Sequence, residues 1–358
     1  MMDTALQPPV SLTLALVALL SAGCAGGADR GDGRADGEDG YVVFSPAPDR
    51  FPLAAAGRPA ALFAAVGEDA GVHRAVASLG DDLERVTGER PPVATDSVAG
   101  GAVVLVGTVG AGGVVDRLIG AGVLDASGLE GRREAFRLSV VERPLPGVDR
   151  ALVIAGSDRR GTIFGIYDLS ARIGVSPWYW WADVPPARHP DLYVLPGGHF
   201  DDGPAVRYRG IFINDEAPAL SGWAHATFGG FDHAFYERVY ELVLRLKGNF
   251  LWPAMWGRSL FDDDSLSAAL AHEYGVVLGT SHHEPMMRAH VEWERYGSGP
   301  WSYEENAERL RAFWRRGIER RGDLESLVTI GMRGDGDLPM TAEADIELLE
   351  RIVADQRS

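Results

Sequence analysis

Residues Tyr208-Arg209-Gly210-Ile211-Phe212-Ile213 form a largely apolar run that ends in the polar Asn214-Asp215-Glu216, and an amphipathic helix is predicted after them at 231–247. The same order of run, cluster and helix recurs further along the chain. The later units are 249–251, 252–256 and 265–274; 276–279, 280–285 and 303–320; and 327–332, 333–337 and 342–357. Such alternation, with buried strands, predicts a parallel sheet with right-handed crossovers.

Each polar or aromatic cluster falls between a predicted strand and the next predicted helix. In βα-barrels and open α/β sheets, active sites are built at this edge. A closed barrel of this type needs about eight such units. We therefore expect residues 201–358 to form the first half of a (β/α)8 TIM-type barrel, and the chain to be an N-terminal fragment of a longer enzyme with two unpaired sheet edges.

The composition is that of a soluble globular protein with room for two domains, at 358 residues and 46% hydrophobic content. A formal net charge of −17 argues against nucleic acid as a partner, because phosphate binding needs clustered basic residues. Cys24 is the single cysteine, which excludes an intrachain disulfide framework and a site made of several thiolates.

Residues 1–24 read as a signal peptide. The apolar run 10–20 is too short to span a bilayer but suits a signal-peptide core. It leads into Leu20-Ser21-Ala22-Gly23-Cys24, which resembles the bacterial lipoprotein box. We expect export, with lipid attached at Cys24; a plain secretory signal with an incidental cysteine is the alternative. Residues 25–40 are rich in Gly, Ala and Asp and predict a flexible linker.

Residues 41–200 predict a small N-terminal α/β domain. The expected strands are 41–44, 60–66, 103–106, 135–141 and 152–155, and the expected helices are 71–87, 114–118 and 156–173. Arg159 and Arg160, at the start of the last helix, could cap it or bind an anion. The predicted fold class of the whole chain is α/β.

Four acids stand at the ends of the first and fourth predicted strands of the repeated units: Asp215, Glu216, Asp335 and Asp337. Carboxylates that face each other across a barrel mouth suit general acid and base catalysis on glycosides. We predict these four as catalytic candidates. The alternative is that they cap helices or accept hydrogen bonds from loop amides.

The neighbouring polar and aromatic residues are predicted to bind substrate. Asn214 stands beside the first acids, and Arg333 could clamp an anionic group with two hydrogen bonds or serve as an ion-pair partner. Trp252 and Trp256 stand at a strand's carboxyl end, where indole rings can stack on sugars, although packing is the ordinary role of large aromatic residues.

His282-His283-Glu284 suggests a metal site. Adjacent side chains on a strand point to opposite faces, so the two histidines are expected to be poorly placed to share one ion. We therefore predict no metal and no other cofactor. Hydrogen bonding of a histidine to a substrate hydroxyl or carboxylate is the preferred interpretation, and Glu284 is placed with these substrate-binding residues.

Four of these motifs resemble glycoside hydrolase family 115. They are Arg209-Gly210-Ile211-Phe212-Ile213-Asn214-Asp215-Glu216, Leu251-Trp252-Pro253-Ala254-Met255-Trp256, Gly279-Thr280-Ser281-His282-His283-Glu284-Pro285-Met286-Met287-Arg288 and Gly331-Met332-Arg333-Gly334-Asp335-Gly336-Asp337. Residues 156–165 and 176–184 resemble the family's first domain and its junction to the barrel. Together the matches extend over most of residues 41–340.

The resemblance implies an inverting, metal-independent xylan α-1,2-glucuronidase that removes glucuronic or 4-O-methylglucuronic acid side groups. The substrate would be glucuronoxylan or its oligosaccharides. The acid/base machinery would include Asp337 or Asp335, with Glu216 and Asp215 opposite or supporting. Arg333, His282 or His283 would bind the uronate, and Trp252 and Trp256 would shape the sugar pocket. A homodimer of the full-length form is a further expectation.

Two other functions are compatible with the sequence. A hexosaminidase-like hydrolase shares a small α/β domain before a barrel and an Asp-Glu pair, although the 281–284 and 333–337 motifs disfavour it. The other is a truncated, non-catalytic, carbohydrate-binding lipoprotein, which would bind sugar without turnover.

Overall fold

The structure is a computed structural model that describes residues 40–343 and 345–358. The predicted signal peptide, Cys24 and nearly all of the predicted linker lie outside the described residues. None of the helices within the described ranges is long and apolar enough to cross a membrane.

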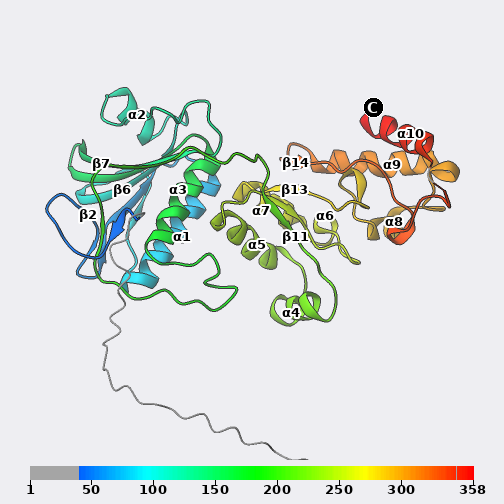
Figure 1. Cartoon of the computed structure of the whole chain (residues 1–358), viewed down its shortest axis with the longest axis horizontal. Helices are drawn as coiled ribbons and strands as arrows, with labels where there is room; N and C mark the ends of the chain where they lie inside the picture. The colour runs from blue at the N-terminus through cyan, green and yellow to red at the C-terminus, as the bar shows by residue number, and fades with distance from the viewer. Residues whose placement is uncertain (1–39, 344) are drawn as a thin grey trace, which may run out of the picture. The chain divides into compact units, whose positions relative to one another are not determined.

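A six-stranded mixed sheet forms the centre of the first part of the chain (Figure 1). Its strand order is β10 (Gly198–Asp201), β7 (Phe136–Leu145), β8 (Val148–Gly156), β6 (Gly100–Thr108), β4 (Ala61–Ala64) and β5 (Val93–Ala94). Strands β5, β4, β6 and β8 run parallel, and β7 pairs antiparallel with β8 and β10. The predicted α/β organisation is confirmed here.

Alternating side chains of β6 enter two separate cores, as the pleat requires. Val104 and Val106 pack with helices α1 (Ala70–Thr87) and α3 (Arg159–Arg172). Val103 and Leu105 pack on the other face with α2 (Val114–Gly120). Both faces of the sheet are therefore covered.

A second, smaller sheet has the order β1 (Val42–Val43), β9 (Leu192–Val194), β2 (Phe51–Ala55) and β3 (Arg58–Pro59), with every pairing antiparallel. The sequence did not predict β2, β3, β5, β9 or β10. Strands β2 and β3 contain prolines, and β5, β9 and β10 have four residues or fewer, so the strand signal of each is weak.

The repeated units build a parallel sheet in the order β11 (Gly210–Phe212), β12 (Phe250–Trp252), β13 (Val277–Gly279) and β14 (Ser326–Leu327). Gly210 pairs with Phe250, Leu251 with Leu278, and Gly279 with Leu327. The predicted parallel sheet is confirmed, and the four clusters follow their strands on one edge.

The predicted fourth strand at 327–332 is wrong, because the observed strand β14 is much shorter and ends at Leu327. Strand β13 ends at Gly279, which leaves no ladder partner beyond Leu327. Thr329 instead accepts a hydrogen bond from Met286 N at 2.9 Å and donates its hydroxyl to Thr280 O at 2.6 Å. The chain after β14 therefore follows the loop after β13.

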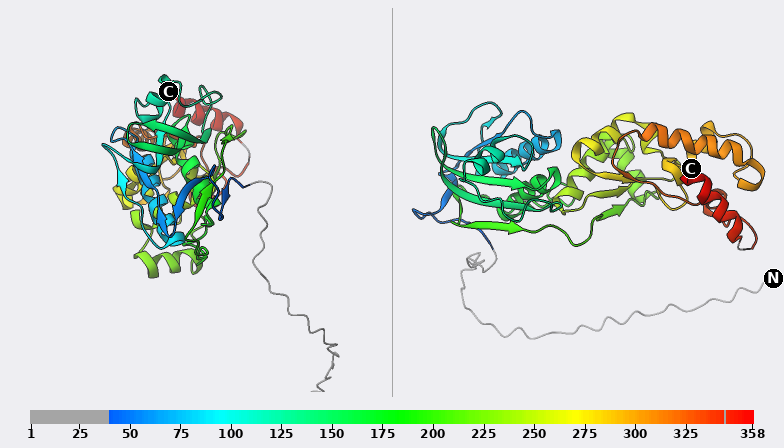
Figure 2. Two further views of the ribbon diagram at one scale, coloured as in Figure 1. Left: turned by 90° about the vertical axis from the view of Figure 1, so that its left-hand side faces the viewer. Right: turned by 90° about the horizontal axis from the view of Figure 1, so that it is seen from above.

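Helices follow each strand of the parallel sheet (Figures 1 and 2). They are α4 (Ala219–Phe228), α5 (His233–Arg245), α6 (Leu260–Asp263), α7 (Ser265–Tyr274), α8 (Val291–Tyr296), α9 (Tyr303–Arg321) and α10 (Ile346–Arg357), with two 3-10 turns, η1 (Pro285–Met287) and η2 (Asp335–Asp337). Asp232, Asp264 and Asp345 cap α5, α7 and α10 by accepting hydrogen bonds from their first turns. The helices at 231–247, 265–274 and 303–320 are confirmed within two residues, and the one at 342–357 begins later. Helices α4, α6 and α8 were not predicted.

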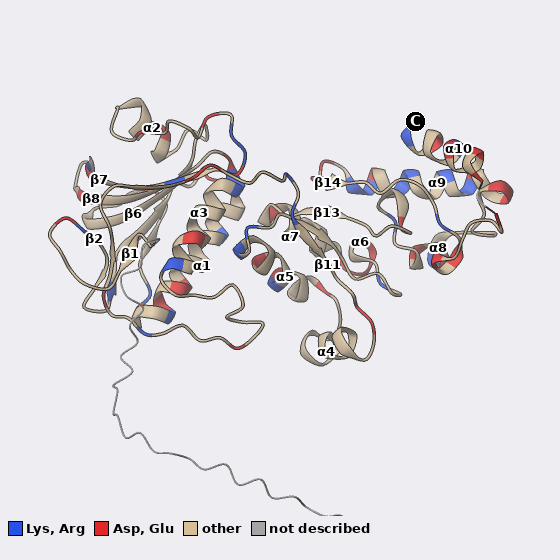
Figure 3. Ribbon diagram, viewed as in Figure 1, with Lys and Arg blue, Asp and Glu red and all other residues tan. Residues whose placement is uncertain are grey.

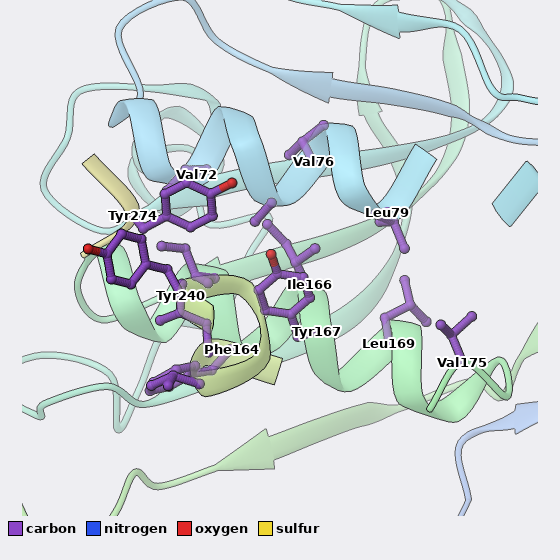
Figure 4. Close-up of a cluster of buried hydrophobic side chains, with 14 of the residues drawn as sticks. Val72, Val76, Leu79, Phe164, Ile166, Tyr167, Leu169, Val175, Tyr240 and Tyr274 are labelled. Atoms are coloured by element: carbon purple, nitrogen blue, oxygen red, sulfur yellow. The ribbon is translucent and has the colours of Figure 1, made fainter. Parts of the chain in front are cut away.

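One continuous apolar core joins the parallel sheet's helices to α1 and α3. Figure 4 shows Tyr240 of α5 and Tyr274 of α7 beside Val72 of α1 and the aromatic residues of α3. Tyr240 is fully buried, and its hydroxyl donates to Ser267 O at 2.9 Å. The six-stranded sheet therefore supports the parallel sheet through α1 and α3.

A buried polar junction joins the same two layers. The fully buried carboxylate of Glu134 accepts hydrogen bonds from Arg160 Nε at 2.7 Å, Asn249 Nδ2 at 2.7 Å and Arg209 Nη2 at 2.6 Å. Arg160 also pairs with Glu325, next to β14, at 2.6 Å. Arg160 is thus part of the junction, and the cap of α3 is Asp158, which accepts from Gly161 N at 2.8 Å.

Candidate active site

The loop after β13 carries three histidines. Thr280 Oγ1 donates to Glu284 O at 2.6 Å, which closes a turn that contains His282 and His283. His283 is buried with its side chain 3% exposed, whereas the side chain of His282 is 46% exposed. His290 follows just before α8.

The loop after β14 brings Asp337 to these histidines. Gly334 N donates to Leu338 O at 2.7 Å, and a Cβ at position 334 would lie 2.4 Å from Pro339 O, so the two arms of the loop approach closely at a glycine. Asp337 adopts a φ of 68°, a left-handed conformation that is uncommon for residues other than glycine. Arg333 Nη2 donates to Asp337 O at 3.1 Å and supports this conformation.

The Asp337 carboxylate lies among three basic side chains. His282 Nε2 is 3.2 Å from Oδ2, His283 Nδ1 is 3.9 Å from Oδ1, and Arg333 Nε is 2.7 Å from Oδ1. The Arg333 contact is an ion pair without hydrogen-bond alignment, and Oδ1 is a buried oxygen with no aligned donor among the described residues. We call His282, His283, Arg333 and Asp337 the Asp337 cluster.

The Asp337 cluster has a definite charge state. Burial alone would raise the pKa of Asp337, but the hydrogen bond from His282 and the charges of His282 and Arg333 outweigh burial and hold this pKa below its usual value. Burial lowers the pKa of His283, and the Asp337 carboxylate opposes this only in part. Near neutral pH, Asp337 is therefore an ionised carboxylate beside a neutral His283.

The expectation that His282 and His283 point to opposite faces is wrong. It assumed a strand, whereas β13 ends at Gly279 and the histidines lie in the following turn. One nitrogen of each histidine and one oxygen of Asp337 lie within 4.8 Å of one another. This spacing resembles a metal-ligand set, but the Asp337 carboxylate already pairs with Arg333, whose positive charge opposes a cation there.

Asp335 lies apart from Asp337 although only Gly336 separates them. Its side chain is 78% exposed and accepts from His290 Nε2 at 2.8 Å. Trp301 Nε1 donates to Arg333 O at 2.9 Å and its ring lies 5.0 Å from that of His290, so both residues support this loop. Asp337 is therefore the better placed of the two predicted acids.

Asp215 is buried and acts on the backbone. Its carboxylate accepts hydrogen bonds from Met255 N at 3.0 Å and Trp256 N at 3.1 Å, which ties the end of β11 to the loop after β12. Glu216 and Asn214 are exposed at the same strand end, and Figure 3 shows acidic residues in the segment between β11 and α4. The structure brings neither Asp215 nor Glu216 into contact with Asp337.

The two predicted tryptophans have different surroundings. Trp252 packs with its edge against Phe212, at a centroid distance of 5.4 Å, within an aromatic group on the sheet. Trp256 is 47% exposed, and its ring lies 5.8 Å from that of His283. Only Trp256 therefore adjoins the Asp337 cluster.

Glu284 was predicted to bind substrate, and the structure places its carboxylate inside its own loop. The residue is 2% exposed, and its oxygens accept hydrogen bonds from His290 N at 3.2 Å and Ser281 N at 3.4 Å. Burial raises the pKa of Glu284 to about 8, although the two amides favour the ionised form. In this arrangement Glu284 holds the two ends of the histidine loop together.

The raised pKa of Glu284 predicts a pH-dependent stability difference from Glu284→Gln. Between the ordinary pKa of 4.5 and about 8, the folded state retains a proton that the unfolded state loses. The unfolding free energy of the native chain should therefore fall with rising pH relative to the variant, by up to about 1.4 kcal/mol per pH unit. Urea unfolding of both proteins at pH 5, 6.5 and 8 measures this difference. A constant difference across the three pH values would contradict the assignment.

Four residues near these loops were not predicted: His225, Arg258, His290 and Trp301. His225 and Arg258 line an open pocket together with Glu216 and Trp256. Each of the four is an isolated polar or aromatic residue within or beside a helix, and nothing in its immediate sequence distinguishes it from a packing residue. Only their position in the segments that flank the four clusters could have marked them as candidate site residues.

Comparisons with known proteins agree with this arrangement of motifs. The family model of glycosyl hydrolase family 115 matches residues 201–358. A solved structure described as "a novel family GH115 4-O-Methyl-alpha-glucuronidase, BtGH115A, with specificity for decorated arabinogalactans" is 34% identical, with a TM-score of 0.74 over 86% of this chain. The chain belongs to glycosyl hydrolase family 115. The sequence motifs resembled this same family, and the predicted family membership is therefore confirmed.

The chain spans only 40% of the length of that family 115 structure. A chitobiase from Flavobacterium johnsoniae is also similar, at 12% identity and a TM-score of 0.46, over 83% of this chain and 44% of its own. A search of curated protein sequences finds no match.

Proposed function

We propose that this chain is part of an α-glucuronidase that removes glucuronic or 4-O-methylglucuronic acid side groups from a polysaccharide. The observation that carries the proposal is the 34% identity, over 86% of the chain, to a structure described as a 4-O-methyl-alpha-glucuronidase. The Asp337 cluster supplies the chemistry that such a reaction needs, a carboxylate for catalysis and cations for an anionic sugar.

Asp337 is the proposed general base. A base must be ionised at the working pH, and the charges of His282 and Arg333 keep the pKa of Asp337 low. An inverting glycosidase activates a water molecule with this carboxylate on the face opposite the leaving group. The Asp337 side chain is 31% exposed, so its carboxylate would be accessible to that water and would accept its proton.

The general acid must lie about 6.5–9.5 Å from the base in an inverting enzyme. Glu216 is the exposed carboxyl at the end of β11. We propose Glu216 as the acid. The alternative is a carboxyl in a region that only the family 115 relative contains, since this chain spans 40% of that relative. Asp215 has a positioning role, because backbone amides occupy its carboxylate.

Arg333 and the histidines are the proposed uronate-binding residues. Arg333 uses Nε and Nη2 on Asp337, and among the described residues its Nη1 has no hydrogen-bond partner. A guanidinium can bind carboxylates on two edges, so Arg333 can hold Asp337 and the substrate's carboxylate together. His282, which is exposed beside them, would donate to the same group.

We further propose that the parallel sheet is the first half of a (β/α)8 barrel. Four parallel strands, each followed by helices, support this proposal. Ile211 and Phe212 of the edge strand β11 are 41% and 38% exposed, and exposed apolar edge strands are normally covered. Further βα units would pair with β11 and β14 and bury these side chains.

The proposed substrate is glucuronoxylan. Arabinogalactan that carries uronic acid is a second candidate, because the family 115 relative is described as having "specificity for decorated arabinogalactans". On either polymer, the group that an α-glucuronidase removes would be an α-linked uronic acid. The Asp337 cluster would recognise the shared group, and other residues would recognise the polymer.

Export is a further proposal, based on the sequence at 10–24 alone. Lipid attachment at Cys24 would anchor the protein to a bacterial membrane. Mass spectrometry of the mature N-terminus from the membrane fraction of the host tests this directly. A diacylated Cys24 supports the proposal, and a mature protein that begins elsewhere and lacks lipid contradicts it.

The test of the function is an assay of uronic acid release from both polymers. It uses the 358-residue chain and the full-length product of the gene that encodes it, which we call the extended form. Release by the extended form supports the proposal, and the polymer that is cleaved identifies the substrate. Release of acetamido sugars instead would indicate a hexosaminidase-like enzyme, and sugar binding without any release would indicate a non-catalytic protein.

A further inference from the structure

A second concave surface adjoins the Asp337 cluster. It is an open pocket of about 680 Å³ between the start of α4 and the loop after β12. This volume is within the usual range for small-ligand sites, about 300–1,000 Å³. Its lining includes Glu216, Ser221, His225, Trp256 and Arg258.

Trp256 connects this pocket to the Asp337 cluster. The residue lines the pocket, and its ring lies 5.8 Å from that of His283. The buried Asp215 carboxylate holds the backbone amides of Met255 and Trp256. The backbone of Trp256 is thereby tied to the end of β11, and its side chain adjoins both the pocket and the Asp337 cluster.

Arg258 presents an unneutralised guanidinium to the pocket. Among the described residues it forms no ion pair with a carboxylate, although the chain holds 51 acidic and 34 basic residues. Its Nη2 lies 2.6 Å from His225 Nε2, and His225 Nδ1 lies 3.0 Å from Gly229 O. Because a carbonyl only accepts, Nδ1 carries the proton and Nε2 accepts from Arg258. The neutral histidine therefore orients Arg258 without cancelling its charge.

These groups together suit a sugar ring. Trp256 provides an apolar face, Arg258 donates hydrogen bonds, and Glu216 and the Ser221 hydroxyl can accept them. We propose that this pocket is a second carbohydrate subsite, which binds the neutral sugars of the polysaccharide chain to which the uronic acid is attached. That the ligand is a sugar rests on the proposed function; that Arg258 and Trp256 form a ligand site rests on their geometry.

The experiment measures binding of neutral oligosaccharides that carry no uronic acid, so it does not depend on turnover. Xylotetraose and a galactotetraose are titrated into the 358-residue chain and followed by saturation-transfer NMR. We expect one of the two to bind, and Arg258→Gln to weaken that binding about ten-fold, the effect of one hydrogen bond to a charged donor. Arg311→Gln is the matched control, because Arg311 is an exposed arginine paired with Asp355 outside the pocket.

A second variant blocks the pocket by adding volume. Gly222 lines it from α4, and a Cβ there has no atom within 4 Å, so Gly222→Leu fits the fold and fills the pocket. Loss of oligosaccharide binding in both Arg258→Gln and Gly222→Leu, with binding retained in Arg311→Gln, is the expected result. Undiminished binding in either pocket variant, or no binding of either oligosaccharide to the native chain, would overturn the proposal.

The outcome is separable from that of the proposed function. Arg258-dependent binding without uronic acid release would leave the subsite standing and remove the α-glucuronidase assignment. Release of uronic acid with KM for the polymer unchanged in both pocket variants would support the α-glucuronidase assignment and contradict the subsite.

Discussion

Asp337→Asn is expected to lower kcat for uronic acid release by about 10³-fold, within the range of general acid–base catalysis. Asparagine is nearly isosteric with aspartate and tolerates the left-handed conformation that Asp337 adopts, with φ at 68°. The amide oxygen can still accept from His282, so the loop should keep its shape. The substitution therefore removes only the negative charge and the basic carboxylate oxygen.

Asp335→Asn is the matched control for this prediction. Asp335 stands in the same 3-10 turn, but its side chain is 78% exposed and meets only His290. Its substitution should change kcat less than ten-fold. Both variants are assayed in the form of the protein that releases uronic acid, and circular dichroism checks their folding. A loss in Asp335→Asn as large as that in Asp337→Asn would contradict the assignment of the base to Asp337, and a loss in Asp335→Asn alone would assign the base to Asp335.

Glu134→Ala is expected to lower the free energy of unfolding by about 3–5 kcal/mol, the typical effect of breaking a buried ion pair. The Glu134 side chain is fully buried and accepts hydrogen bonds from Arg160, Arg209 and Asn249. Its removal leaves the Arg209 guanidinium without its carboxylate and opens the junction between α3 and the starts of the parallel strands. Urea unfolding followed by fluorescence measures the change.

Glu142→Ala is the control for burial. Glu142 pairs with Arg150 at 2.6 Å, as close as the pairs of Glu134, but its side chain is 60% exposed. Solvent screens such a pair, and its loss should lower the unfolding free energy by at most about 1 kcal/mol. A loss of less than 1 kcal/mol in Glu134→Ala would contradict a stabilising junction between the two layers.

The periodic elements could be predicted from the sequence, because each has an apolar run or face of the right period. The parallel order β11-β12-β13-β14 and helices α1, α5, α7 and α9 follow from that pattern. Helix α4 could not be predicted in this way. It has proline and glycine near its ends and little amphipathic character, so its sequence is similar to that of a loop. Strand β14 is short because its neighbour turns away, a tertiary effect that no local pattern contains.

The site was predictable at the level of motifs but not of individual side chains. Asp335 and Asp337 have the same chemistry and nearly the same position in the sequence. Only the turn at η2 separates them, and it turns one toward His282 and the other toward solvent. The two adjacent histidines converge because they lie in a turn and not in a strand. Asp215 and Glu284 are buried acids whose backbone partners depend on the folded loops.

The central claim is that the Asp337 cluster belongs to an inverting hydrolase of α-linked uronic acid. Time-resolved proton NMR of glucuronoxylan or uronic-acid-bearing arabinogalactan, treated with the extended protein, tests it in one measurement. The account predicts that the first uronic acid to appear is the β-anomer, which then equilibrates with the α-anomer. Initial release of the α-anomer, or no uronic acid from either polymer, would contradict it.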